Sequence, residues 1–340
     1  MSSTTTGVTG KLAATGMSAP LLLFSRHYDR VSAIADGRIL LRGQRARCEV
    51  MPSIPATFQR MMADPEVLAG EMSFGFQAVV ASQQARSRFL GIPVFLSRTF
   101  RHGNVFVRAD SSVHDFGDLR GKRVALEEYA MTMGIWVRGL MKDAGVGPEE
   151  ISWVGAKDPV VGPEIAESLS RRVKLERSSG EALWSLLLRG EVDAVIGRPP
   201  TNRSLDNGTV RRLLSDHWDR QRQYFRDTGI FPTMHLLVLR RDVYDEDPQM
   251  ALDLYAAFDD ARGRAVEDLR TNLNALAVTL PMLEEHVEHT RQVFGEDWWP
   301  YGIARNRAAI ETFLSYCFEQ GLTRAPVQLE QTFCPNTLAL

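Results

Sequence analysis

Short apolar segments alternate with amphipathic segments along most of the chain, and this alternation predicts an α/β protein. Apolar runs bounded by glycines or polar turns predict strands at residues 21–25, 45–51, 91–95, 105–107, 122–126, 151–154, 192–197 and 235–240. Apolar positions three and four residues apart predict helices at 26–36, 55–62, 77–88, 131–143 and 181–189, several of them ended by a glycine such as Gly37 or Gly145. Strands that alternate with helices favour a parallel sheet covered on both faces.

Two amphipathic helices in the C-terminal third are predicted to be part of the core. The first starts at Asp247-Pro248, because proline is well tolerated in a first turn, and the second ends at Gly321. Their apolar stripes are Ala251, Leu254, Tyr255, Phe258, Ala265 and Leu269 in the first, and Ile310, Phe313, Leu314 and Cys317 in the second. Stripes at helical spacing face a core, so we assign them no chemistry.

The length and the charge of the chain narrow the classes of protein to which it can belong. Its 340 residues exceed what one ordinary core holds, and they predict two lobes. The formal net charge of −2 gives no basic field, so we expect no nucleic-acid partner. Cys48, Cys317 and Cys334 are far apart and form no CxxC pair, which argues against a thiolate zinc site and against a disulfide framework.

The N-terminal segment, residues 1–18, is rich in serine, threonine, glycine and alanine and predicts a flexible tail. The apolar run at 21–24 is far too short for the core of a signal peptide. No stretch approaches the ~20 apolar residues that cross a bilayer. We therefore expect a cytoplasmic protein with no membrane partner.

Several motifs resemble those of known families. The segment DLRGKRV at 118–124 resembles the start of the second lobe of type 2 periplasmic binding proteins. Motifs spread from about residue 24 to the C-terminus resemble the 4,5-dihydroxyphthalate decarboxylase family: YDR at 28–30 with DGR at 36–38, SRTFRH at 97–102, Tyr129 with MT at 131–132, WVRG at 136–139, TGIFP at 228–232 with MH at 234–235, WPYG at 299–302 and EQGL at 319–322. Glu127 and Ala130 depart from the family pattern, which has a proline and a polar residue there, and they leave a different substrate open.

The resemblance implies a two-lobed α/β fold of the type 2 periplasmic-binding-protein kind, with a ligand cleft between the lobes. Lobe one would hold residues 19–112 and 232–340, and lobe two, inserted between them, would hold residues 113–231. Crossover segments near 108–113 and 228–232 would form the hinge. Ligands of open α/β sheets bind outside the carboxyl ends of the strands, so residues next to strand ends are the candidates for the site.

Six residues are predicted to bind the substrate. Arginine matches a carboxylate with its planar fork, and three arginines lie at a predicted strand end or beside the first crossover. The start of the helix at 131–143 offers free N–H groups to an anion. The predicted residues are Arg101, Arg26, Arg198, Ser73, Tyr129 and Thr132. A surface or packing role is the alternative for each of them.

Four residues are predicted to move protons: His102, His235, His27 and Glu128. Histidine gives or takes a proton near neutral pH, and a carboxyl group held near arginines can act as a base toward a phenol. His27 follows the first strand, whereas His102 and His235 lie beside the two crossovers. A structural role for each histidine and a salt bridge for Glu128 stay open as alternatives.

Other polar and aromatic features are assigned structural roles. We expect Arg138 to form a structural ion pair, and the aromatic run at 298–301 to pack the C-terminal helices, with a pocket wall as the alternative. The run with Glu284, Glu285, His286, Glu288 and His289 has a spacing that can hold a metal, but it is typical of a solvated helix face. No cofactor is predicted, and a divalent metal held in the cleft by His27, His102 and His235 stays open.

These residues and the resemblance lead us to expect a carboxy-lyase of aromatic-compound catabolism. It would decarboxylate a hydroxylated aromatic acid such as 4,5-dihydroxyphthalate, with arginines holding the carboxylates and a histidine protonating the ring. The expected partner is a small aromatic carboxylate, and a homo-oligomer stays open. The alternative is a non-enzymatic solute-binding protein or a cytoplasmic ligand sensor, because a fold does not decide between binding and catalysis.

Overall fold

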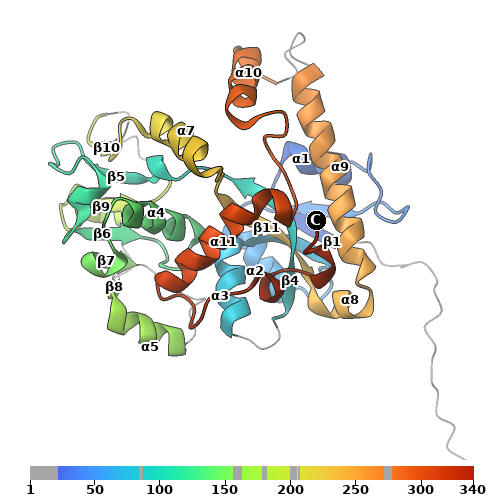
Figure 1. Cartoon of the computed structure of the whole chain (residues 1–340), viewed down its shortest axis with the longest axis horizontal. Helices are drawn as coiled ribbons and strands as arrows, with labels where there is room; N and C mark the ends of the chain where they lie inside the picture. The colour runs from blue at the N-terminus through green and yellow to red at the C-terminus, as the bar shows by residue number, and fades with distance from the viewer. Residues whose placement is uncertain are drawn as a thin grey trace, which may run out of the picture.

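The computed structural model describes residues 22–83, 87–155, 163–177, 182–199, 205, 207–271 and 278–340. In this part of the chain the strands form two sheets, one of five strands and one of six, which Figure 1 shows at the right and at the left of the molecule. The tail predicted for residues 1–18 and part of the helix predicted at 77–88 lie outside the described residues.

The first sheet combines strands from distant parts of the chain. Its order is β2-β1-β3-β11-β4, and its strands are β1 Leu22–Ser25, β2 Arg47–Val50, β3 Ala69–Ser73, β4 Phe89–Arg98 and β11 Thr233–Arg240. β1 runs parallel to β2 and β3, whereas β11 runs antiparallel to both of its neighbours, β3 and β4. The insertion of β11 makes the first sheet discontinuous in sequence.

The second sheet is built from the middle of the chain. Its order is β10-β5-β9-β6-β7-β8, and its strands are β5 Val105–Arg108, β6 Arg123–Leu126, β7 Ser152–Gly155, β8 Lys174–Arg177, β9 Ala194–Ile196 and β10 Val210–Arg212. β6 to β9 run parallel, and β5 and β10 add antiparallel pairs at one side. Because β5 pairs with β9, the chain leaves the first sheet directly after β4. The predicted lobe boundary at residue 112 stays a prediction.

Each helix that the pattern predicts is present among the described residues, together with others that it does not predict. The described residues form α1 Asp29–Ala35, α2 Ile54–Ala63, α3 Phe74–Gln83, α4 Thr132–Asp143, α5 Pro163–Arg172, α6 Leu183–Leu188, α7 His217–Thr228, α8 Arg241–Glu246, α9 Gln249–Thr271, α10 Leu283–Phe294, α11 Ile303–Glu319 and α12 Leu329–Thr332. Gly37 and Gly145 follow α1 and α4 with φ of 82° and 81°, the left-handed conformation expected at a helix end. The elements that the pattern did not predict include β3, β8, β10, α5 and α7, which are short or strongly charged.

α4 packs between the two sheets and joins their cores. Its Trp136 is fully buried, and the indole N–H donates to the Thr233 carbonyl at the start of β11 (2.9 Å). The same ring packs on Phe313 and Tyr316 of α11, with centroids 5.3 and 5.8 Å away; Figure 1 shows the two helices side by side. The predicted stripe of α11 is buried here, and one hydrophobic cluster extends through both sheets.

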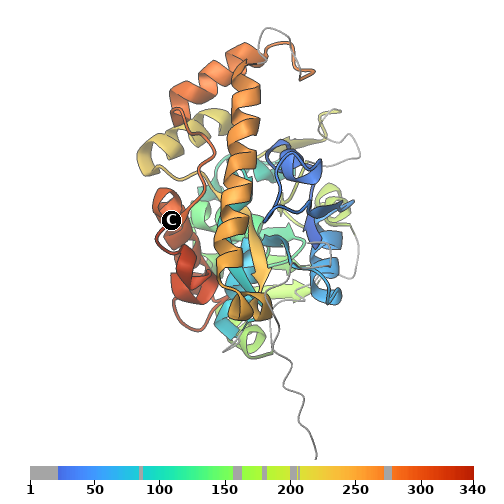
Figure 2. The same cartoon turned by 90° about the vertical axis from the view of Figure 1, so that its right-hand side faces the viewer.

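α9 forms one long helix along the side of the molecule, packed on α1 and β4, and α10 lies beside its far end (Figure 2). Most of its predicted apolar stripe is buried, while Tyr255 and Leu269 are partly exposed. No described helix combines the length and the apolar character that a membrane span requires.

Gly139 makes the closest approach between α4 and α11. A Cβ atom at this position would lie 2.0 Å from the Tyr316 ring. Gly139→Ala should therefore lower the free energy of unfolding by roughly 1–3 kcal/mol, although alanine is the better helix former by ~1 kcal/mol. Chemical denaturation measures the change. Gly263→Ala in α9, where a Cβ meets open space, is the matched control and should not destabilise. Equal stability of the two variants would show that Tyr316 moves aside freely.

Candidate functional site

The first half of the site is the edge of the first sheet where β1 and β3 end and β11 begins. His235 pairs with Ser73 in the register of β11 and β3, and Thr233 pairs with Arg98 at the end of β4. β11 is antiparallel to both neighbours, so its first residues lie beside the last residues of β3 and β4. Residues 26–28 follow β1 at this same edge, where the sequence predicts ligand contacts.

A buried glutamate, Glu71 of β3, organises this edge. Its side chain is fully buried and accepts three hydrogen bonds: from Tyr28 Oη (2.8 Å) and His235 Nδ1 (2.6 Å) at Oε1, and from the Arg26 backbone N–H (3.2 Å) at Oε2. A carboxylate only accepts, so this pairing assigns the proton to Nδ1 of His235 and leaves Nε2 on the far side of the ring. Phe58 holds the same ring edge-on, with centroids 5.7 Å apart. Burial and the charge of Glu71 raise the pKa of Tyr28 well above its usual value, so its hydroxyl remains a donor.

The second half of the site is the edge of the second sheet where β6 ends and α4 begins. Thr132, the first residue of α4, reaches Ser73 of the first sheet, with the two hydroxyl oxygens 2.9 Å apart. Thr132 Oγ1 also accepts from the Gly75 N–H (3.0 Å), and Ser73 Oγ accepts from the Phe76 N–H (3.2 Å). Both hydroxyl residues are buried. The structure thus brings Ser73 and Thr132 together, and their contact joins the carboxyl ends of the two sheets.

Arg101 lies in the segment that leads from β4 to β5. Its Nε is 3.0 Å from the sulfur of Met234, and its Nη1 is 3.5 Å from the sulfur of Met133 and 3.4 Å from Oδ1 of Asn104. Burial, followed by the charge of Arg198, lowers the pKa of Arg101 to about 10, which keeps it cationic at neutral pH. Among the described residues no carboxylate pairs with it. A half-buried cation beside a second arginine, without an acid, is a position for an anion.

His102 packs inward, against α7. Its side chain is buried, and the ring lies 5.3 Å from the ring of Tyr224 and 6.4 Å from that of Phe100. Burial, followed by the charges of Arg220 and His217, lowers the pKa of His102 to about 4. The ring is therefore neutral at pH 7. Its part in proton transfer stays a prediction, and this environment favours a packing role.

Two predicted site residues in the segment after β6, Glu128 and Tyr129, differ in burial. Glu128 is partly exposed. Tyr129 is fully buried, with its ring 3.8 Å from the Arg138 guanidinium and edge-on to Trp153 (5.7 Å), and its predicted contact with the substrate stays a prediction. Arg138 donates to the Tyr129 carbonyl (2.6 Å) and to the Gln320 side chain (2.7 Å). Both residues therefore stabilise the packing of α4, because the Tyr129 ring, the Tyr129 carbonyl and the Gln320 side chain all contact the guanidinium.

The remaining predicted residues lie at the two edges or away from them. His27 and Arg198 are exposed after β1 and β9, while Arg26 is half-buried and its guanidinium donates to the Met51 carbonyl. His286 and His289 are exposed on α10. In the part of the chain that the structure describes, no three side chains of metal-ligating type gather at one point.

Comparison with known proteins identifies the family of this chain. The family described as NMT1/THI5 like matches residues 56–168. A 4,5-dihydroxyphthalate decarboxylase of Comamonas testosteroni is 30% identical to this chain over 317 residues, which are 92% of the chain and 95% of that protein. The chain belongs to the 4,5-dihydroxyphthalate decarboxylase family. A protein of the same name from Pseudomonas putida is 28% identical over 59% of this chain and 79% of its own length. The predictions of this family and of a carboxy-lyase are confirmed.

Solved structures confirm the fold that the motifs imply. The periplasmic aliphatic sulphonate binding protein SsuA of Escherichia coli matches with a TM-score of 0.54 and 15% identity, over 95% of this chain and all of that one. A periplasmic sulfonate-binding protein SsuA of Methylobacillus flagellatus matches with a TM-score of 0.57 and 15% identity, over 94% and 93% of the two chains. The decarboxylase family member therefore has the two-lobed architecture of periplasmic binding proteins.

Glu71 is the residue of this decarboxylase family member that sequence reasoning missed. It lies inside the apolar run VLAGEMS at 67–73, and charged residues are almost never fully buried unless they are paired. That pattern is a usable signal for a buried acid. The partner could not be found the same way, because His235 is 164 residues further along the chain.

The low pKa of His102 makes the stability of the protein depend on pH. A folded-state pKa of about 4, against 6.5 in the unfolded chain, means that stability is complete above pH 6.5 and falls as the pH drops toward 4. His102→Gln removes this titration. Between pH 7 and pH 4.5 the wild type should lose roughly 2–3 kcal/mol more unfolding free energy than the variant. Urea denaturation at both pH values measures the difference. Parallel losses in the two proteins would contradict the assignment.

Proposed function

We propose that the chain removes carbon dioxide from a hydroxylated aromatic dicarboxylic acid such as 4,5-dihydroxyphthalate, where the carboxyl ends of its two sheets meet. The names of its relatives support this substrate class. The observation that carries the proposal is Arg101, a half-buried guanidinium that contacts sulfur and amide groups rather than an acid. A substrate carboxylate supplies the missing negative charge, and Arg198 adds a second cation.

The reaction needs a proton at the ring carbon that bears the carboxylate. A phenolic hydroxyl para to that carbon releases its proton and pushes electrons into the ring, and the ring carbon is then protonated. The bond to the carboxylate breaks, its electron pair restores the aromatic ring, and carbon dioxide leaves. The phenol regains its proton, so each turnover consumes one proton from solvent. The protein must hold the carboxylates, accept the phenol proton and deliver a proton to the ring.

His235 is the proton donor that the geometry supports best. Glu71 orients it through Nδ1, and Tyr28 and the Arg26 backbone hold Glu71 in turn. A base oriented by a buried acid is the arrangement used for positioned proton transfer. Glu128, partly exposed at the opposite edge, is the proposed base toward the phenol. His27 and His102 remain weaker candidates, since one is exposed and the other is packed against α7.

The alternative function is anion binding without turnover, and the sulfonate-binding proteins of the same fold are the reason to test it. In heavy water the enzyme should release carbon dioxide from 4,5-dihydroxyphthalate and place one deuterium at the carbon that carried the carboxylate. Mass spectrometry and proton NMR of the product measure this, with and without a chelator to test for a divalent metal. Tight binding with no carbon dioxide under either condition would favour the binding protein.

Arg101→Lys tests the anion position. Lysine keeps the charge but loses the planar fork, so substrate binding should weaken by about tenfold or more. Arg264→Lys is the matched control, because Arg264 is an exposed α9 residue paired with Asp260. Isothermal titration with a slowly reacting substrate analogue measures both. An unchanged dissociation constant in Arg101→Lys would remove Arg101 from the site.

Glu71→Gln and His235→Gln test the proton donor. Loss of positioned acid catalysis lowers kcat by roughly 10²–10⁴-fold, and His235→Gln should show this while its substrate affinity changes little. Glu71→Gln should lower kcat less, because the glutamine amide oxygen can still accept the hydrogen bond from His235 Nδ1. Wild-type kcat in both variants would show that the pair has only a structural role.

A further inference from the structure

A cavity of about 330 Å³ lies apart from the proposed substrate site, between α9, α10 and the loop that follows α10. Four aromatic residues form much of its wall: Phe231, Phe294, Trp298 and Trp299. Ala265, Val266 and Leu269 of α9 form the opposite side. None of these residues belongs to the substrate site proposed above. Figure 2 shows α10 beside the upper part of α9.

The aromatic wall is held in place by contacts of its own. Trp299 Nε1 donates to the Phe95 carbonyl (3.0 Å), and its ring meets that of Phe231 edge-on at 5.5 Å. Phe231 also lies 5.3 Å from Phe294. The guanidinium of Arg270 lies 4.9 Å from the centre of the Trp298 ring. These contacts do not depend on a ligand, so the cavity is preformed, as small-molecule sites commonly are.

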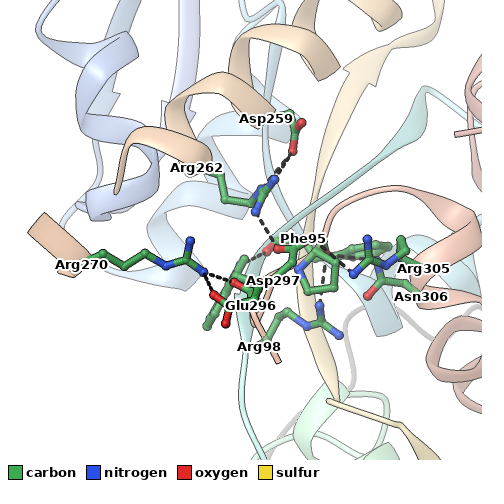
Figure 3. Close-up of polar contacts among 11 residues, drawn as sticks. Phe95, Arg98, Asp259, Arg262, Arg270, Glu296, Asp297, Arg305 and Asn306 are labelled. Carbon is green, nitrogen blue, oxygen red and sulfur yellow. Dashed lines mark hydrogen bonds and ion pairs between the residues drawn. The ribbon is translucent and has the colours of Figure 1, made fainter. Parts of the chain in front are cut away.

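The two cations that line the cavity are already paired. Arg262 binds Asp259 (2.9 Å) and Asp297 (2.8 Å), as Figure 3 shows. Arg30 pairs with Asp29 and donates to the Leu96 carbonyl, and its guanidinium lies between the rings of Tyr28 (4.1 Å) and Trp299 (4.4 Å). A carboxylate entering this cavity would find no unpaired cation, and a buried charge without a partner is strongly disfavoured.

We propose that this cavity is a binding site for a neutral, single-ring aromatic compound of the phenol class. Its volume is at the lower end of the roughly 300–1,000 Å³ of small-molecule pockets, which suits one ring. The aromatic walls offer edge and face contacts to that ring. The hydroxyl of Thr290, which donates to the His286 carbonyl, keeps lone pairs that can accept from a phenol. This site thus selects against charge, whereas the site at Arg101 selects for it.

Phenol and benzoate test this selectivity, because they share a ring and differ in charge. On the full-length wild-type protein, calorimetric titration with phenol should show saturable binding. Val266→Phe fills the cavity and should weaken phenol binding at least tenfold. Glu267→Phe places the same side chain on the exposed face of the same turn, and it should leave phenol binding unchanged. Benzoate should bind at least tenfold more weakly than phenol at the site that Val266→Phe removes.

Two further variants separate this site from the catalytic one. Arg101→Lys should leave phenol binding at the cavity unchanged, and Val266→Phe should leave decarboxylation unchanged, so the two proposals fail independently. Thr290→Phe, which fills the cavity from α10, replaces Val266→Phe if the latter does not fold by circular dichroism. Phenol binding that survives both filling variants, or benzoate binding that is equally strong and equally sensitive to them, would overturn the proposal.

Discussion

The return of β11 to the first sheet is the constraint on which the rest of this structure depends. β11 pairs with β3 and β4, so the chain must cross to the second sheet after β4 and come back before Thr233. That return sets His235 against Glu71, two residues that lie far apart in sequence. It also provides the carbonyl of Thr233 to which Trp136 donates, which ties α4 to the first sheet. Both the pairing of His235 with Glu71, which we propose to be catalytic, and the contact between the sheets follow from one strand.

Two charged residues near the edges where the sheets meet, Glu71 and Arg101, differ in their hydrogen-bond partners. Glu71 is fully buried, and hydrogen-bond donors contact both of its oxygens. Its negative charge therefore stabilises the positions of Tyr28, His235 and the Arg26 backbone. Arg101 is half-buried, and its hydrogen-bond partners are two thioether sulfurs, which are weak acceptors, and one amide oxygen 3.4 Å away, none of which carries a negative charge. A cation without an acid is costly unless a ligand supplies one. The contrast is the physical reason to separate a positioning role for Glu71 from a binding role for Arg101.

A buried arginine, Arg98, also holds the segments around the predicted second crossover, through hydrogen bonds to backbone carbonyls. Arg98, at the end of β4, donates to the carbonyls of Phe231 (2.8 Å) and Pro300 (3.1 Å), so it joins the predicted second crossover to the loop before α11. Burial lowers its pKa to about 9. Phe231 lies 4.8 Å from this guanidinium and also lines the aromatic cavity. Phe231 of the predicted crossover at 228–232 therefore also forms part of the cavity wall, which links the packing of these two regions.

The sequence by itself determined the alternation of strands and helices, the apolar stripes of α9 and α11, the family and the fold, because these depend on periodicity and on motifs that are local in the chain. Arg101, Thr132 and His235, which the sequence places near predicted strands, lie near the two edges, whereas Ser73 ends β3, a strand that the pattern did not predict. Only the tertiary structure decided which of them touch. Glu71 finds its partner across 164 residues, β5 changes sheets through a pairing that its short apolar run does not encode, and Tyr129 turns inward because Arg138 and Trp153 cover its ring. Local patterns specify whether a segment forms a helix or a strand. Packing between distant segments decides which side chains are buried and which of them contact each other.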